Sequence, residues 1–177
     1  MNASLSASKA NRTGTILGAA VLLGILAIGG AWYSEVMLGY NPCKLCLWQR
    51  WPYYLGLPFG MAAFVLHREN PGIARILAFF LAMTFVISVG LGIYHAGVEW
   101  KWWLGPAECG GKLLSGPASV EDFRKSLSTA KVIRCDDAAV RVLGLSFAGW
   151  NAVVSAAIAT LAVLAAGKLQ GSSSVSQ

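Results

Sequence analysis

The sequence has few charged residues: they make up 12% of the 177-residue chain, whereas soluble domains carry about 25%. Hydrophobic residues account for 56%, and the mean hydropathy is +0.59. These values exclude an ordinary soluble domain and indicate a membrane protein whose length suits one compact bundle. The net charge of +6 comes without a basic cluster interleaved with aromatic residues, so we expect no nucleic acid as a partner.

Charged residues are missing from four long stretches, and each stretch is apolar enough to form a helix in a membrane core of about 30 Å. The sequence therefore predicts an all-α membrane protein, a bundle of four transmembrane helices. A cleaved signal peptide is the alternative for the first stretch, but its apolar run is longer than the usual ~7–15 residues. The predicted helices cover about residues 15–34, 46–66, 75–94 and 142–166.

The second apolar stretch, Trp51–Leu66, is barely long enough to span a membrane. We therefore expect this helix to begin earlier, near Leu45, which draws Arg50 into the edge of the bilayer. Pro52 and Pro58 fall in its first half and are expected to kink it.

Four spans place both chain termini on one side of the membrane and the two longer loops on the other. The flanking charges favour cytoplasmic termini, because Lys9 and Arg12 precede the first helix and Arg68 and Arg75 lie between the second and third. The second loop is more basic than the first, but positive charge in long translocated loops weighs less. The expected layout is one transmembrane domain (15–168), outer loops 35–45 and 95–141, and cytoplasmic tails 1–14 and 169–177, the first of them disordered.

Two of the four cysteines form a Cys-x-x-Cys pair, Cys43 and Cys46, in the first outer loop. A structural clip closing so short a loop stabilises little. A Cys₄ zinc site with Cys109 and Cys135 is possible, but these two are widely spaced, and an oxidising compartment disfavours four free thiolates. A redox pair is favoured, because nearby cations and a helix start next to the pair lower a thiol pKa.

The other two cysteines, Cys109 and Cys135, lie in the second outer loop. A disulfide between them would contribute roughly 3 kcal/mol by constraining the unfolded chain, which is the structural interpretation. Glycines and prolines flank Cys109 and keep it open to attack, which favours a disulfide that exchanges with a partner protein.

Three polar residues stand out near or within the predicted helices. Arg50 either snorkels to water or directs its guanidinium at a quinone carbonyl, where it would stabilise developing negative charge. His95 ends the third predicted helix at the same outer boundary, either as an interfacial residue or as a hydrogen-bond donor to a quinone. Asn151, in the fourth helix, is expected to make an interhelical hydrogen bond.

Several short motifs around these residues extend over about residues 16–166. They are Asn41-Pro42-Cys43-x-x-Cys46, Arg50, Tyr94-His95-x-Gly97-Val98-Glu99-Trp100, Gly105-Pro106 before Cys109, Cys135-Asp136, and Leu143-Gly144-Leu145-Ser146-x-Ala148-Gly149-Trp150-Asn151. In this combination the sequence resembles the disulfide bond formation protein B (DsbB) family. Lys44, inside the Cys-x-x-Cys pair, departs from the apolar residues of many relatives.

The resemblance implies a multi-pass protein of the bacterial inner membrane with its cysteine loops in the periplasm. Such a protein reoxidises a DsbA-like periplasmic thiol oxidase and passes electrons to ubiquinone or menaquinone in the membrane lipid, and the DsbA–DsbB–quinone system keeps the bacterial periplasm oxidising. Arg50 and His95 match family positions near the quinone.

The same resemblance implies a role for each cysteine. Cys109 takes the attack of the reduced partner, and Cys135 is its disulfide mate. Cys43 exchanges with that second pair, and Cys46 lies next to the quinone.

Three alternatives stay open from the sequence. The chain could be a paralogous oxidase that serves one dedicated partner. It could be a structural membrane protein whose disulfides only stabilise its loops. A small transporter is disfavoured, because Asn151 is an isolated polar residue and Arg50 and His95 lie at the membrane edge.

Overall fold

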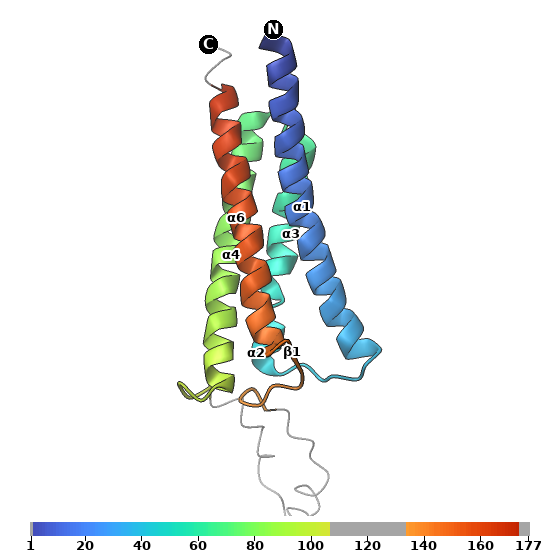
Figure 1. Cartoon of the computed structure of the whole chain (residues 1–177), viewed down its shortest axis with the longest axis vertical. Helices are drawn as coiled ribbons and strands as arrows, with labels where there is room; N and C mark the ends of the chain where they lie inside the picture. Colours follow the sequence, from blue (N-terminus) through green and yellow to red (C-terminus); the bar gives the residue numbers. More distant parts are fainter. Residues whose placement is uncertain (1, 107–133, 174–177) are drawn as a thin grey trace, which may run out of the picture.

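The computed structural model describes residues 2–106 and 134–173 of the chain (Figure 1). Within these residues, long helices run side by side and short elements cap one end of the bundle. The start of the first helix and the end of the last lie together at the opposite end (Figure 1). The elements are α1 (Asn2–Val36), α2 (Lys44–Trp48), α3 (Trp51–Leu66), α4 (Pro71–Glu99), β1 (Arg141–Val142), β2 (Leu145–Ser146) and α6 (Phe147–Ser173).

Three of the described helices contain segments long and apolar enough to cross a membrane, namely Asn11–Val36, Pro71–Glu99 and Phe147–Gln170. The chain is therefore a mostly helical, multi-pass membrane protein. Helix α3 has 16 residues and measures about 24 Å at 1.5 Å per residue, so it is shorter than an ordinary span of about 20 residues. A fourth span stays a prediction.

The bounds of the helices differ from those expected. Helix α1 begins at Asn2, so most of the segment expected as a disordered tail is helical. The expected helix 46–66 is divided into α2 and α3, which are separated by Gln49 and Arg50. Pro52 takes a first-turn position of α3, where a missing backbone N–H costs nothing, and Pro58 lies inside the helix.

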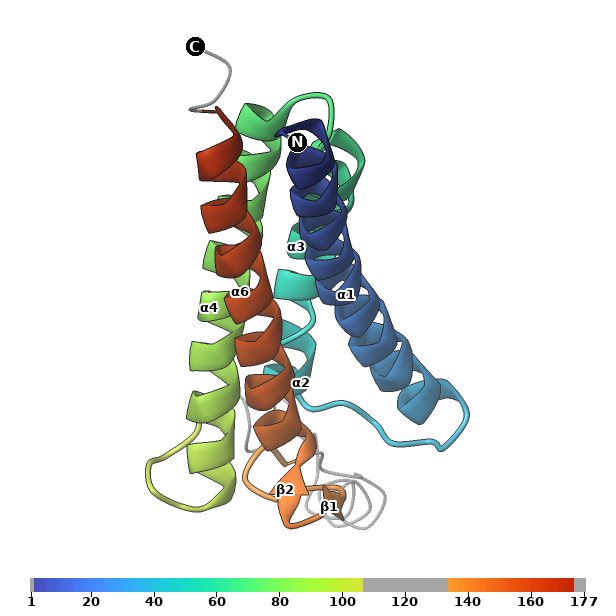
Figure 2. The ribbon, with the colours of Figure 1, turned by 45° about the horizontal axis from the view of Figure 1, so that its top comes forward.

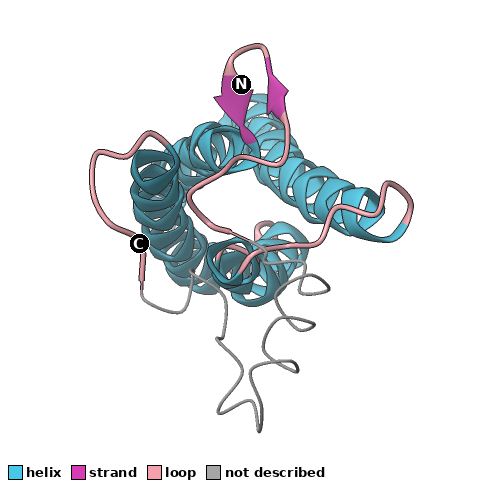
Figure 3. Cartoon of the chain, turned by 90° about the horizontal axis from the view of Figure 1, so that it is seen from below, coloured by secondary structure: helices cyan, strands magenta, loops and turns pink. Residues whose placement is uncertain are grey.

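The last helix starts at Phe147 and not at residue 142 as expected. Leu143 and Gly144 have positive φ angles of 52° and 83°, and they form the tight turn between β1 and β2. Such a turn matches the twist of a two-stranded hairpin but cannot continue a helix. The hairpin lies at the periphery of the bundle when it is viewed from the α2 end (Figure 3).

Helix α1 packs against α3 and α6 but leans away from the bundle toward its α2 end (Figure 2). The centre of the bundle is filled by buried apolar side chains of α3, α4 and α6, among them Tyr53, Leu81, Phe85 and Ile158. The ring of Phe85 contacts Tyr53 edge-on, with 5.0 Å between centroids. The lean of α1 therefore opens one side of an otherwise packed bundle.

Helices α4 and α6 are in close backbone contact at Gly92. A Cβ atom placed there would lie 2.9 Å from the backbone nitrogen of Ala152, so no larger side chain fits without moving the helices apart. Small residues allow such close backbone contact between membrane helices.

We predict that Gly92→Val lowers the thermal midpoint of the protein in detergent, because overpacking costs about 1–3 kcal/mol of unfolding free energy. Gly90→Val is the matched control, since a Cβ atom at Gly90 meets no atom within 4 Å. Equal midpoints for the two variants would show that the α4–α6 contact is looser than described.

Candidate active site

The Cys-x-x-Cys pair lies at the start of α2. Cys43 is the N-cap of this helix, and the backbone N–H of Cys46 donates to its sulfur at 3.2 Å. The two sulfurs are 2.7 Å apart, and both cysteines are free. Cys43 is buried and Cys46 is half-buried, so the pair presents one sulfur to the interior and one toward the surface of the bundle.

His95, on α4, lies directly behind the dithiol and is only 2% exposed. Its Nε2 atom is 3.6 Å from the sulfur of Cys43 and 3.2 Å from the backbone oxygen of Cys135. Its Nδ1 atom contacts the side-chain amide of Gln49 at 2.6 Å. One turn further along α4, a carboxylate oxygen of Glu99 lies 3.7 Å from Nε2.

Cys135 joins the same cluster from the segment between α4 and β1. It is 1% exposed, packs with Cys43, Leu45 and Val98, and is disulfide-bonded. The Cys₄ zinc site considered from the sequence needs Cys135 as a thiolate, so the disulfide removes that interpretation. Cys109 lies outside the described residues.

Ion pairs hold the segment after Cys135 in place. Asp136 accepts from Lys101 at 2.5 Å and from Arg134 at 2.7 and 2.9 Å. Hydrogen bonds from Arg134 and Lys101 hold the pKa of Asp136 well below its usual range, so its carboxylate stays ionised. Lys101 follows the end of α4, and this contact therefore ties the Cys135 segment to the helix that carries His95.

The two thiols of the Cys-x-x-Cys pair differ in acidity. The hydrogen bond from Cys46, supported by His95 and opposed by burial, lowers the pKa of Cys43 to about 5. The same contact, together with burial, raises the pKa of Cys46. In the reduced pair, Cys43 therefore carries the thiolate and Cys46 keeps its proton.

We predict that alkylation of Cys43 in the reduced protein follows an apparent pKa of about 5. The thiolate is the reacting species, so the rate stays high at mildly acidic pH and falls only as pH drops through this value. Iodoacetamide labelling with site identification by mass spectrometry measures the profile. Cys46→Ala removes the thiol that donates to Cys43, so the apparent pKa of the profile should rise toward that of an ordinary thiol, about 8.5. A wild-type profile already centred there would contradict the assignment.

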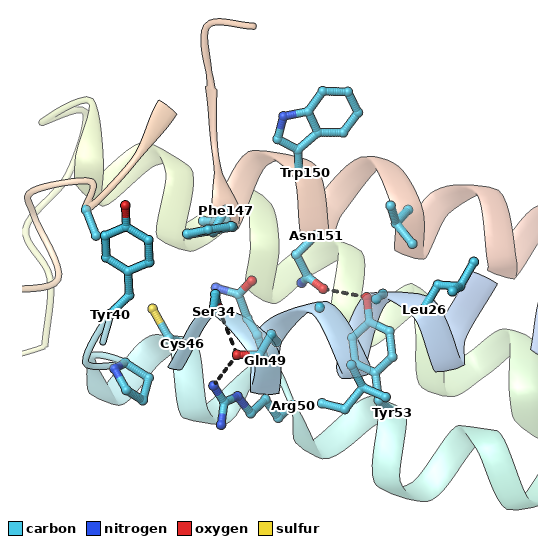
Figure 4. Close-up of a pocket in the computed structure, with 18 of the residues that line it drawn as sticks. Leu26, Ser34, Tyr40, Cys46, Gln49, Arg50, Tyr53, Phe147, Trp150 and Asn151 are labelled. Carbon is cyan, nitrogen blue, oxygen red and sulfur yellow. Dashed lines mark hydrogen bonds between the residues drawn. The ribbon is translucent and has the colours of Figure 1, made fainter. Parts of the chain in front are cut away.

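A cavity of about 340 Å³ lies beside Cys46, on the side where α1 leans away (Figure 4). Apolar side chains of α1 and α6 form most of its wall. Its polar lining comes mainly from Ser34, Cys46, Gln49, Arg50, Tyr53 and Asn151. The sulfur of Cys46 is thus shared between the dithiol and the cavity.

Arg50 is 8% exposed and does not extend into solvent, contrary to the snorkelling alternative. Its guanidinium donates to Glu35 of α1 at 2.5 Å and to the backbone oxygen of Ala31 at 3.4 Å. The same group lies over the ring of Trp32, 5.2 Å from its centroid. Arg50 therefore fixes the leaning end of α1 to the start of α3 at the wall of the cavity.

A polar cluster forms the inner end of the cavity. The hydroxyl of Tyr53 donates to Asn151 at 2.7 Å, which confirms the interhelical bond expected for Asn151 (Figure 4). Ser155 lies 3.4 Å from the same hydroxyl and donates to Ser88 at 2.8 Å. These contacts join α3, α4 and α6 and leave Tyr53 and Asn151 facing the cavity.

The structure thus gathers Cys43, Cys46, His95 and Cys135 in one cluster, with Arg50 on the adjoining cavity wall. His95 is not among the described residues that line the cavity, and it contacts Cys43, the buried member of the dithiol. The sequence did not predict three residues that contact the site: Glu35, which pairs with Arg50, and Gln49 and Glu99, which contact His95. A lone acid at the end of an uncharged run was the available signal for Glu35.

Comparison with known proteins identifies the family. The family described as "Disulfide bond formation protein DsbB" matches residues 12–165. The chain belongs to the DsbB family. Membership of the DsbB family implies a disulfide-generating membrane oxidoreductase.

The sequence of this DsbB-family chain is similar to those of several curated proteins. The uncharacterized protein RP370 of Rickettsia prowazekii is 22% identical over 137 residues, which cover 76% of this chain and 77% of the relative. Disulfide bond formation protein B 1 of Pseudomonas putida is 42% identical over 80 residues, 44% of each chain. Disulfide bond formation protein B of Acinetobacter baylyi is 32% identical over 88 residues, 48% of this chain and 49% of the relative.

The match to each disulfide bond formation protein therefore spans about half of that protein's length. No solved structure gives a significant match to the chain.

Proposed function

We propose that the chain is a protein dithiol:quinone oxidoreductase. It reoxidises a DsbA-like periplasmic thiol oxidase and passes the electrons to ubiquinone or menaquinone. The observation that carries this proposal is the double position of Cys46, whose sulfur contacts Cys43 and also lines an apolar cavity in a membrane protein. Family membership supports the same chemistry.

The cavity fits a flat apolar ring with polar ends. Its volume of about 340 Å³ is within the range of small-molecule sites, about 300–1,000 Å³, and its walls are mostly apolar. Arg50 supplies positive charge close to Cys46, and Tyr53 and Asn151 supply polar groups at the inner end. A quinone bound there would accept two electrons and two protons from the dithiol.

The cluster around His95 suits thiol–disulfide exchange between the two cysteine pairs. In the proposed exchange, the thiolate of Cys135 attacks the sulfur of Cys43 in an oxidised Cys43–Cys46 pair, and Cys46 leaves as a thiolate. Cys109 then attacks Cys135, which re-forms the second disulfide and releases Cys43 as a thiolate. The burial of Cys43 and Cys135 in one packed apolar group supports this step.

His95 and Lys101 have separate parts in this exchange. The imidazole lies 3.6 Å from the sulfur of Cys43 and stabilises the thiolate that forms on this sulfur when the mixed disulfide is resolved. It can also donate a proton to the Cys43 thiolate or accept one from the Cys43 thiol. Lys101 holds Asp136 and so keeps Cys135 next to the imidazole.

We further propose that the chain resides in the bacterial inner membrane with its termini in the cytoplasm. Both described cysteine segments lie at one end of the bundle, and the start of α1 and the end of α6 lie at the other (Figure 1). The distribution of basic residues supports cytoplasmic termini. With the termini in the cytoplasm, the thiols face an oxidising compartment, where disulfides persist.

Quinone reduction by the purified protein in detergent tests the proposal, with a reduced thioredoxin-like periplasmic oxidase as electron donor. We expect loss of the quinone absorbance with one donor disulfide formed per quinone consumed. Absence of turnover, with the Cys135 disulfide stable to the donor, would overturn the proposal in favour of a structural membrane protein. Turnover with one particular donor and not with others would identify a paralogous oxidase for a dedicated partner.

A further inference from the structure

We propose that the reduced Cys43–Cys46 pair, His95 and Glu99 form a binding site for a thiophilic divalent cation of the Zn²⁺ type. Binding of the cation and formation of the Cys43–Cys46 disulfide exclude each other, so the site exists only in the reduced chain. The site itself does not depend on quinone chemistry. Only its consequence, that a bound cation stops turnover, rests on the proposed function.

The first three ligand atoms are already grouped. The sulfurs of Cys43 and Cys46 and a ring nitrogen of His95 all lie within 4.8 Å of one another. A tetrahedral zinc site with Zn–S of about 2.3 Å and Zn–N of about 2.0–2.1 Å needs about 3.5–3.6 Å between sulfur and nitrogen. The sulfur of Cys43 and the Nε2 atom of His95 are 3.6 Å apart.

The two sulfurs must separate before they can share a cation. They are 2.7 Å apart, whereas the same tetrahedral geometry places two thiolates about 3.8 Å from each other. The required movement is about 1 Å, and the half-buried side chain of Cys46 faces the cavity into which it can turn.

Glu99 provides an independent sign of a missing ligand. It is only 9% exposed, and its Oε2 atom is buried without a hydrogen-bond partner among the described residues. Ser146 contacts the carboxyl group, and the Oε1 atom lies 3.7 Å from the Nε2 atom of His95. A buried oxygen without a partner destabilises the fold, and a cation between His95 and the sulfurs would satisfy it as the fourth ligand.

Gln49 can orient the imidazole of His95 either for thiol chemistry or for binding a cation. Its side-chain amide contacts the Nδ1 atom of His95 at 2.6 Å. With the amide oxygen toward the ring, Gln49 accepts from Nδ1–H and leaves the Nε2 lone pair free for a cation. With the amide nitrogen toward the ring, as in this structure, the proton lies on Nε2 and faces Cys43 and the backbone oxygen of Cys135. One amide rotation therefore switches the histidine between thiol chemistry and metal ligation.

The ligand set selects the cation by chemical type. Two thiolates and an imidazole favour Zn²⁺ or Cd²⁺ and disfavour Mg²⁺ and Ca²⁺, which prefer oxygen ligands. Binding involves no electron transfer: two Zn–S bonds form, and protons still held by the thiols are released to solvent. The sulfurs are then no longer available to form a disulfide.

The test uses the full chain, reduced with dithiothreitol, desalted without oxygen and titrated with Zn²⁺ or Cd²⁺. Because dithiothreitol also reduces the disulfide of Cys135, the same titration is made on Cys109→Ser, in which only three thiols remain. The readouts are the ultraviolet thiolate-to-Cd²⁺ charge-transfer band and the Zn²⁺ content after desalting. We expect one cation per reduced chain and none per chain with an oxidised Cys43–Cys46 pair. Equal binding by the two redox forms, or no binding by the reduced form, would overturn the proposal without any variant.

Variants then test the ligand set. His95→Gln should weaken binding about 100-fold and Glu99→Gln about 10-fold, within the range found for changes around a metal centre. His67→Gln and Glu35→Gln are the matched controls, since these residues lie outside the proposed ligand set. If both His95→Gln and Glu99→Gln bind the cation with wild-type affinity, the two sulfurs alone account for binding, and the proposal is overturned.

A turnover assay separates this inference from the proposed function. If the chain reduces quinone, stoichiometric Zn²⁺ added to the reduced form should block turnover, and a chelator should restore it. If the chain binds Zn²⁺ but never reduces quinone, the proposed function fails and the metal site stands. Turnover that continues with Zn²⁺ demonstrably bound would overturn the inhibitory consequence.

Discussion

Replacement of Cys46 by serine is expected to abolish electron transfer to quinone, with a loss in turnover of about 10³-fold or more. The reason is the position of this sulfur, which is shared between the dithiol and the cavity. A serine hydroxyl has the same shape but cannot form a disulfide, so electrons that reach Cys43 have no further route. Quinone absorbance during turnover with a reduced donor measures the effect.

The same variant should accumulate a trapped intermediate. Cys43 can still attack the second disulfide at Cys135, which releases Cys109 as a thiolate. Without Cys46 this mixed disulfide can only be reversed by Cys109, so part of the chain stays in this form. Non-reducing peptide mapping should find this bond in Cys46→Ser and not in Cys43→Ser. Substantial turnover in Cys46→Ser would exclude the route through this sulfur.

Replacement of Arg50 by alanine is expected to raise the apparent KM for quinone about 10–100-fold with a smaller change in kcat. The guanidinium is buried at the cavity wall, and a hydrogen bond from a charged donor contributes about 1.5–3 kcal/mol. Its loss also leaves the carboxylate of Glu35 without its ion-pair partner. Steady-state kinetics over a range of quinone concentrations separates affinity from turnover.

Two further variants define what Arg50 contributes. Arg68→Ala is the matched control, since Arg68 bonds to Asn11 and does not line the cavity. Glu35→Gln releases Arg50 from its ion pair, and we expect it to keep or improve quinone affinity. An unchanged apparent KM in Arg50→Ala would remove the role assigned to this residue.

Local patterns predicted a good part of the structure. Uncharged runs located the long helices. The single helix expected from near Leu45 to Leu66 is interrupted, because the short α2 begins at Lys44 with Cys43 as its cap and α3 begins only at Trp51. The turn at Leu143 escaped prediction, because a leucine with positive φ gives no local signal of a break. Helix α1 also continues into a polar segment that its composition did not mark as helical.

Contacts between distant segments were less accessible from the sequence. His95 lies near the end of α4, but its contact with Cys43 joins residues 52 positions apart and depends on how α2 docks against α4. Glu99 follows His95 by one helical turn, so the pair could have been inferred from spacing. The link between Glu35 and Arg50 depends on the angle at which α1 crosses α3, which no local pattern specifies.

The lean of α1 determines from which phase a ligand reaches the dithiol. Leu26 on α1 and Val154 on α6 both line the cavity, and apolar side chains of these helices are exposed beside it, for example Val153 at 51%. A molecule dissolved among the lipid chains could therefore enter sideways between α1 and α6, with its head group at Cys46 and a long tail left outside. Water-soluble analogues that lack a tail would lose the contribution of those helix surfaces, and detergent would compete for the same side entrance.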